Sequence, residues 1–291
     1  MGKMKAVLKL TRIEHSIILL VAVIAAELIS AHHLPGLAVF VLSMITPAFV
    51  SMGSFAINDY YDIGADRANK RMDRPLVNGS LTKRQAMWIV VSCFVIGVLA
   101  SLFINAYAFV IALIFAALAI LYSYRLKDMP VLGNIYIAFS MVIPFVYGDF
   151  VVTNSFHISI VLISITIFLA GVAREIHGMI RDYKGDEKAR GSRNLLFHVG
   201  KARASQLAAI LYAEAVLVSI YMFFFYAPFA FNLVYIVPIA ITDVTLLYIS
   251  YGFLVQKKSR EFYGFSRNAS LAVMALSVLA FLAAALLYVR I

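Results

Sequence analysis

Residues 84–124 read RQAMWIVVSCFVIGVLASLFINAYAFVIALIFAALAILYSY, and no charged side chain follows Arg84 in this stretch. The run is continuously apolar and does not alternate between apolar and polar residues, which favours helices over strands. Because a helix needs about 20 apolar residues to cross a bilayer, the stretch is long enough for two crossings, at 84–104 and 107–124. It therefore predicts two membrane-spanning helices joined by the short connection NAY.

The rest of the 291-residue chain has the same character, with 63% hydrophobic residues, 14% charged residues and a mean hydropathy of +0.91. Soluble domains are roughly half apolar and about a quarter charged, so this composition excludes a water-soluble protein, a disordered protein and a nucleic-acid-binding protein. We expect an all-α integral membrane protein with one domain over residues 1–291. Its nine transmembrane helices are predicted at 13–31, 35–57, 84–104, 107–124, 132–153, 157–179, 204–226, 229–255 and 268–289.

The positive charges of this chain are segregated along the sequence. The net charge of +10 comes from 25 Lys and Arg against 15 Asp and Glu, and every Lys and Arg except Arg290 lies in or beside alternate connections. The remaining connections, HHLPG, NAY, TNSFH and APFAF, contain neither Lys nor Arg. Since positively charged loops stay in the cytoplasm, we expect a multi-pass protein of the cell membrane, with the N-terminus cytoplasmic and the C-terminus outside. A site formed by the charged loops would face the cytoplasm.

The first long charged connection, residues 58–85, reads NDYYDIGADRANKRMDRPLVNGSLTKRQ. Asn58, Asp62 and Asp66 have the i, i+4, i+8 spacing that puts them on one face of a helix, with Asp59 on a neighbouring face. Carboxylates at this spacing repel one another unless a cation lies between them. Mg²⁺ commonly takes one or two carboxylates together with substrate phosphates. The motif therefore favours a metal and phosphate site over its alternative, a solvated helix with internal ion pairs.

The second long charged connection follows the sixth predicted helix and contains REIHGMIRDYKGDEKARGSRNL, residues 174–195. Asp182 and Asp186 repeat the i, i+4 carboxylate pair, and basic residues again surround it. Two acidic motifs with many cations on one side of a membrane fit a Mg²⁺-bound diphosphate. In a bundle of apolar helices, the simplest such substrate is a polyprenyl diphosphate.

The chain resembles the UbiA superfamily of intramembrane prenyltransferases. The resemblance rests on NDxxDxxxD at 58–66, the following RPLVNGSLT at 74–82, and DxxxD at 182–186. It implies Mg²⁺-dependent transfer of a prenyl group from its diphosphate to a lipophilic acceptor. The implied catalytic residues are Asn58, Asp62, Asp66, Asp182 and Asp186. The implied Mg²⁺ ligands are Asp59, Asp62, Asp66, Asp182 and Asp186. The implied diphosphate-binding residues are Arg12, Arg67, Tyr124 and Lys127.

Several stretches, among them LYSYRLKDMPVLGN and REIHGMIRDYKGDEKARG, resemble the archaeal lipid branch of this family, which makes digeranylgeranylglyceryl phosphate. This branch implies a geranylgeranyl donor and geranylgeranylglyceryl phosphate as acceptor. A phosphorylated acceptor needs cations beyond those that hold the diphosphate, and Arg174 or Lys184 could supply them. His177, five residues before Asp182, is interpreted as a structural residue.

Two other functions are consistent with parts of the sequence. One is an aromatic-ring prenyltransferase of quinone biosynthesis, which would use the same donor site with a different acceptor. The other is a membrane transporter or lipid-handling protein. Transporters tend to have ionisable groups and broken helices near the membrane midplane, whereas the charges here gather at one surface, so the enzyme is favoured. No obligate protein partner is expected.

Overall fold

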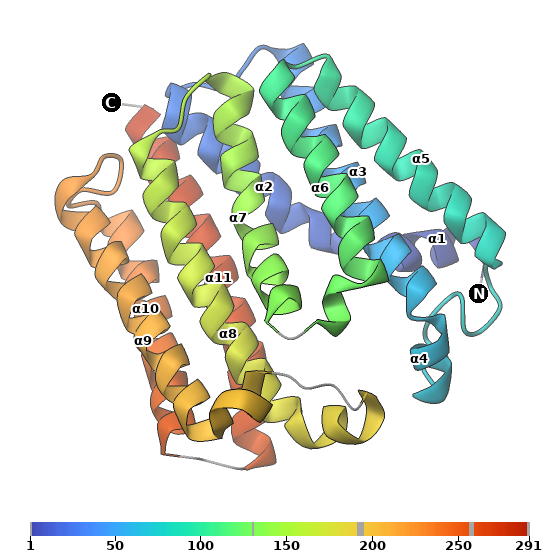
Figure 1. Ribbon diagram of the computed structural model, residues 1–291. Helices are drawn as coiled ribbons and strands as arrows, with labels where there is room; N and C mark the ends of the chain where they lie inside the picture. The colour runs from blue at the N-terminus through green and yellow to red at the C-terminus, as the bar shows by residue number, and fades with distance from the viewer. Residues whose placement is uncertain (1, 130, 191–194, 256–258, 290–291) are drawn as a thin grey trace.

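A computed structural model describes residues 2–129, 131–190, 195–255 and 259–289, without the side chains of 182–190, 195, 197 and 198 (Figure 1). All regular structure in these residues is helical. The elements are α1 (Lys3–Thr11), α2 (Ile13–Ala31), α3 (Leu37–Tyr61), α4 (Ile63–Ala68), α5 (Lys83–Leu102), α6 (Ala106–Tyr124), the 3₁₀ helix η1 (Leu126–Asp128), α7 (Leu132–Val152), α8 (Ile158–Arg190), α9 (Leu195–Phe225), α10 (Leu233–Leu254) and α11 (Arg260–Val289).

The prediction of nine transmembrane helices is confirmed within the described residues. The helices long and apolar enough to cross a membrane are α2, α3 and α5 to α11. The boundaries differ where charged residues follow an apolar span. Helix α8 runs to Arg190 instead of ending near 179, and α11 begins at Arg260, ahead of its apolar part. Helix α9 begins at Leu195 but is interrupted at Gly200, where the backbone is not helical (φ 74°, ψ 161°), so the part that continues to Phe225 starts close to the predicted 204. Charge limits where a helix can enter the hydrocarbon but does not end it, because a helix satisfies its own backbone.

The helices form a closed circuit that is divided into two halves, chiefly by the contact between α2 and α7. Helices α2, α3, α6 and α7 are neighbours around the first half, and α5 packs on its outside against α3 and α6. Helices α7 to α11 continue the circuit, and α11 returns to α2. The contact between α2 and α7 crosses this circuit. It separates the α2–α3–α6–α7 compartment from a second compartment bounded by α7 to α11.

Small residues let these helices approach closely, as is common inside membranes. Gly148 of α7 lies against α2, and a Cβ placed there would be 2.7 Å from the backbone oxygen of Val23. Gly171 of α8 similarly faces Ala138 of α7. At these two glycines no side chain separates the helices, so α7 packs closely against both α2 and α8.

The amphipathic helix α1 lies at the right-hand side of the bundle in Figure 1, near the lower end of α5. It buries Ala6 and Leu10 in a cluster with Ala56 and Ile57, near the end of α3. The chain then turns into α2 through Arg12, whose backbone is left-handed at φ 47° and ψ 50°. This turn places the Arg12 side chain beside the acidic end of α3.

Candidate active site

The first acidic motif lies on a nearly continuous helix. Helix α3 ends at Tyr61 and α4 begins at Ile63, but the Asp62 amide still donates to the Asn58 oxygen at 3.0 Å and the Asp66 amide to the Asp62 oxygen at 2.8 Å. The i, i+4 geometry therefore holds across the junction. The Asn58 amide group also donates to the Asp62 carboxylate at 2.9 Å. Asn58, Asp62 and Asp66 thus share one face, as their spacing predicts.

Asp59 is the buried centre of a group of charges. Its side chain is 2% exposed and accepts hydrogen bonds from Arg12 at 2.6 Å and from Arg74 at 3.0 and 3.2 Å. The Arg74 Nε atom lies 3.7 Å from the Asp66 carboxylate, so Arg74 spans two acidic residues. The Arg12 guanidinium also lies over the Phe55 ring, 4.9 Å from its centroid. Two arginines far apart in the sequence therefore converge on the acidic end of α3.

Lys127 reaches the same group from the other side. It lies in η1, and its Nζ atom is 2.5 Å from the Asp62 carboxylate. The close approach of Gly133, whose Cβ would lie 2.9 Å from a backbone oxygen in η1, holds this turn against the start of α7. Tyr124 is exposed and packs edge-on against Tyr61, with the ring centroids 5.7 Å apart.

The predicted site residues therefore divide into three groups. The structure brings together Asn58, Asp59, Asp62 and Asp66 with Arg12 and Lys127. Arg67 and Tyr124 are both exposed and lie outside this cluster. Arg67, on α4, is absent from the ion pairs found among the described residues, and Tyr124 contacts Tyr61. Asp182 and Asp186 lie in the helical extension of α8, but their side chains are outside the described part of the structure.

Arg74 is the main residue of this cluster that we did not predict as a site residue. The signal for it was its place at the start of RPLVNGSLT, directly after the acidic motif. Among the described residues, no three Asp, Glu, His or Cys side chains are grouped as in a metal site. A Mg²⁺ site of the predicted composition therefore depends on Asp182 and Asp186 joining Asp62 and Asp66.

An apolar cavity of about 460 Å³ opens beside this cluster, within the α2–α3–α6–α7 compartment. Arg12 and Asn58 line one end, and Thr46 and Tyr147 line it further along α3 and α7. Thr46 and Asn58 are twelve residues apart on α3, which corresponds to about 18 Å along the helix axis. Most of the wall is apolar or aromatic, including Phe115. The cavity can hold a long hydrocarbon chain whose polar end meets the charged cluster.

Comparison with known proteins agrees with this arrangement. The model of the UbiA prenyltransferase family matches residues 19–271. A digeranylgeranylglyceryl phosphate synthase from Archaeoglobus fulgidus is 35% identical over 282 residues, which cover 97% of this chain and 96% of that protein.

Two solved structures have the same fold. A structure described as digeranylgeranylglyceryl phosphate synthase in membranes has a TM-score of 0.81 at 29% identity, over 98% of this chain and 99% of its own. A UbiA homolog from Archaeoglobus fulgidus bound to GPP and Mg²⁺ has a TM-score of 0.67 at 23% identity, over 98% of this chain and 100% of its own. The resemblance noted in the sequence is confirmed, and this multi-pass membrane protein belongs to the UbiA prenyltransferase family.

Proposed function

We propose that this prenyltransferase moves a geranylgeranyl group from its diphosphate to the free hydroxyl of geranylgeranylglyceryl phosphate, a step of archaeal membrane-lipid synthesis. The observation that carries the donor half is the apolar cavity that begins at Arg12 and Asn58, beside the cluster of Asp59, Asp62 and Lys127. A prenyl diphosphate has the same division into a charged head and an apolar tail. The names of the curated relatives support the acceptor half.

The carboxylate oxygens of the two acidic motifs suit Mg²⁺. Asp62 and Asp66 offer hard carboxylate oxygens, and their side chains are 22% and 12% exposed, so a ligand can reach them. Asp182 and Asp186 complete the proposed set. When bound, Mg²⁺ would neutralise the diphosphate and make it a better leaving group. Both carboxylate oxygens of Asp59 accept bonds from arginines, and those of Asp62 accept bonds from Asn58 and Lys127. Asp59 is only 2% exposed, so its predicted role as a ligand requires the surrounding arginines to shift, whereas Asp62 can be reached from outside.

The chain's own residues would act by binding, orienting and excluding water. Arg12, Arg74 and Lys127 would bind diphosphate oxygens, and the wall of the apolar cavity would hold the tail and the developing allylic cation away from water. The bond between C1 of the prenyl group and the diphosphate breaks, and the diphosphate keeps the electron pair. The acceptor hydroxyl oxygen then bonds to C1 and releases its proton, which leaves an ether.

The proposed orientation has the N-terminus in the cytoplasm, the C-terminus outside and the active site facing the cytoplasm. The support is that Arg12, Arg74 and Lys127 gather at one end of the bundle, which is the end that the positive-inside rule assigns to the cytoplasm. We also propose that residues 1–291 form a single domain.

The test is product analysis with purified full-length protein, labelled geranylgeranyl diphosphate and one acceptor at a time. We expect an ether-linked product with geranylgeranylglyceryl phosphate, no product after chelation of Mg²⁺, and recovery when Mg²⁺ is restored. The Asp62→Asn variant should lose most of this activity. Prenylation of an aromatic quinone precursor instead of the glyceryl phosphate would refute the acceptor, and full activity in Asp62→Asn would refute the donor site.

A further inference from the structure

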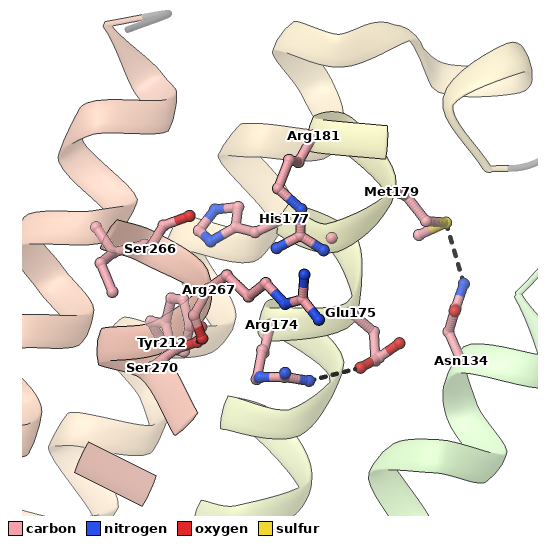
Figure 2. Close-up of a pocket in the computed structure, with 12 residues that line it drawn as sticks. Asn134, Arg174, Glu175, His177, Met179, Arg181, Tyr212, Ser266, Arg267 and Ser270 are labelled. Atoms are coloured by element: carbon pink, nitrogen blue, oxygen red, sulfur yellow. Dashed lines mark hydrogen bonds and ion pairs between the residues drawn. The ribbon is translucent and has the colours of Figure 1, made fainter. Parts of the chain in front are cut away.

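A second cavity, of about 400 Å³, lies in the other compartment of the bundle, between α7, α8, α9, α10 and α11. Unlike the apolar cavity, it is lined mostly by polar and charged side chains. Figure 2 shows the guanidinium groups of Arg174, Arg181 and Arg267 converging in it. Arg174 and Arg181 come from α8 and Arg267 from α11, so the convergence depends on the fold and not on one charged loop.

Several buried polar atoms that line this cavity have no partner among the described residues. His177 is 4% exposed and Tyr212 is 0% exposed. The two ring nitrogens of His177 and the hydroxyl of Tyr212 nevertheless make no hydrogen bond to a described residue. The Nε atom of Arg174 is also without one. The His177 ring stacks on the Phe253 ring, with the ring centroids 4.0 Å apart and an angle of 6° between the ring planes. Buried polar groups nearly always have partners. A ligand that accepts hydrogen bonds would satisfy the donors among these atoms, namely the Tyr212 hydroxyl, the Nε atom of Arg174 and the protonated ring nitrogen of His177.

The charges of the lining select the class of ligand. Arg174 and Glu175 form an ion pair at 2.9 Å. With Arg181 and Arg267, the described residues of the lining comprise three arginines and one glutamate, an excess of two positive charges among them. A phosphate monoester carries about −1.5 to −2 charge at pH 7 and has three strong acceptor oxygens. Arginine binds such groups through several parallel hydrogen bonds. The cavity therefore matches a single phosphate group in both charge and hydrogen bonding.

The position of the cavity connects it to the proposed reaction. Asn134 of α7 lines the polar cavity, while Tyr136 and Ile137, less than one turn further along α7, line the apolar one. The two cavities therefore lie on opposite sides of the first turn of α7. Arg181 directly precedes Asp182 of the second acidic motif. A phosphate in the polar cavity would thus lie next to the place where the donor diphosphate is proposed to react.

We propose that the polar cavity binds the phosphate of the lipid acceptor, through Arg174, Arg181 and Arg267 with hydrogen bonds from His177 and Tyr212. This inference rests on the proposed function, which supplies a glyceryl phosphate acceptor. In that acceptor two carbons separate the free hydroxyl from the phosphate oxygen. Binding of the phosphate therefore also places the hydroxyl that attacks the donor, which is the orienting contribution expected of such a site.

The principal test compares Arg267→Gln with Arg260→Gln in the full-length protein. Arg260 lies on the same helix, is exposed and does not line the cavity, so it is a matched control. The loss of one charged hydrogen-bonding partner should raise the KM for geranylgeranylglyceryl phosphate by about ten-fold or more. The KM for geranylgeranyl diphosphate should stay within about two-fold of wild type, and the control should match wild type in both.

The outcomes separate the two proposals. Wild-type protein that makes no product from the glyceryl phosphate acceptor would refute the proposed function. Wild-type turnover with an unchanged acceptor KM in Arg267→Gln, or with an equal rise in both KM values, would overturn only the phosphate site. Inorganic phosphate should compete with the acceptor in the wild type and lose this effect in Arg267→Gln. Competition with the donor instead would assign the cavity to the diphosphate.

Tyr212→Phe gives a test that does not depend on charge. The substitution removes a buried hydroxyl that has no hydrogen bond to any described residue, so the Tm should stay level or rise. The acceptor KM should nevertheless increase, because the hydroxyl would bond to the bound phosphate. A lower Tm with an unchanged acceptor KM would show that the hydroxyl serves the fold, and would remove Tyr212 from the site.

Discussion

The charge on Asp59, which is buried at the end of α3, should matter more for the fold than the charge of an exposed carboxylate in the connection that follows. Asp59→Asn keeps the size of the side chain but removes the charge that faces Arg12 and Arg74, at 2.6 and 3.0 Å. Those arginine side chains are only 21% and 16% exposed, so water cannot replace the lost partner well. Removing one partner of a buried ion pair costs about 3–5 kcal/mol. We take about 3 kcal/mol, since both arginines retain some exposure.

Thermal unfolding of the purified protein in detergent would measure this effect. For a chain of this size, about 3 kcal/mol corresponds to a fall in Tm of roughly 6–12 °C. The matched control is Asp73→Asn in the same connection. Asp73 is 50% exposed and pairs with Arg71 at 3.6 Å, where Arg71 is 45% exposed. An exposed pair of this kind contributes about 0–1 kcal/mol, so the Tm of this variant should change by no more than about 4 °C.

The Mg²⁺ dependence of activity separates two roles for Asp59. If the carboxylate only holds the two arginines, Asp59→Asn should lower the rate without changing the Mg²⁺ concentration that gives half-maximal activity. If it is a metal ligand, as the sequence motif predicts, that concentration should rise. Equal Tm values for Asp59→Asn and Asp73→Asn would refute the stability argument, because they would show that the buried ion pairs of Asp59 stabilise the fold no more than the exposed pair of Asp73.

Three further predictions concern the donor side and the packing of the helices. Lys127→Gln should raise the KM for the prenyl diphosphate by about ten-fold through loss of a charged contact, and it should leave the acceptor KM unchanged. Steady-state kinetics with each substrate varied in turn would check this. A change in the acceptor KM alone would contradict it. Ala112→Phe adds a ring to the wall of the apolar cavity, so it should shift use from geranylgeranyl toward geranyl diphosphate in a direct competition, and an unchanged product ratio would count against the tail site. Gly148→Ala places a Cβ 2.7 Å from a backbone oxygen of α2, so it should lower the Tm. The control Gly64→Ala should leave the Tm unchanged, because a Cβ there meets nothing within 4 Å. Equal Tm values for the two variants would mean that α2 and α7 can separate without cost.

The sequence was sufficient for the elements but not for most of the contacts between them. Apolar length predicts each membrane helix, because the cost of burying charge in hydrocarbon acts residue by residue. The common face of Asn58, Asp62 and Asp66 also follows from local spacing. The ion pair between Asp62 and Lys127 does not, since 65 residues separate them and their meeting depends on how α3, η1 and α7 pack.

The polar cavity was the least predictable feature. Arg174 was considered for a second anionic substrate from its position alone, but its proximity to Arg267 depends on the packing of α8 against α9 to α11. The sequence favours a structural role for His177. Its stacking on Phe253 agrees with that interpretation, while its ring nitrogens, which have no partner among the described residues, also point to a ligand. Such unsatisfied atoms are visible only once the helices are assembled.

The contact between α2 and α7, where Gly148 meets the backbone of α2, has a consequence for the length of chain that the apolar cavity admits. The contact is made by the backbone of Val23 and the Cβ of Ala26, which no side-chain rotation can move. Tyr147, the residue before Gly148, lines the apolar cavity. The cavity wall at this point is therefore fixed by the packing of two helices, and a longer chain could be accommodated there only if the helices moved apart.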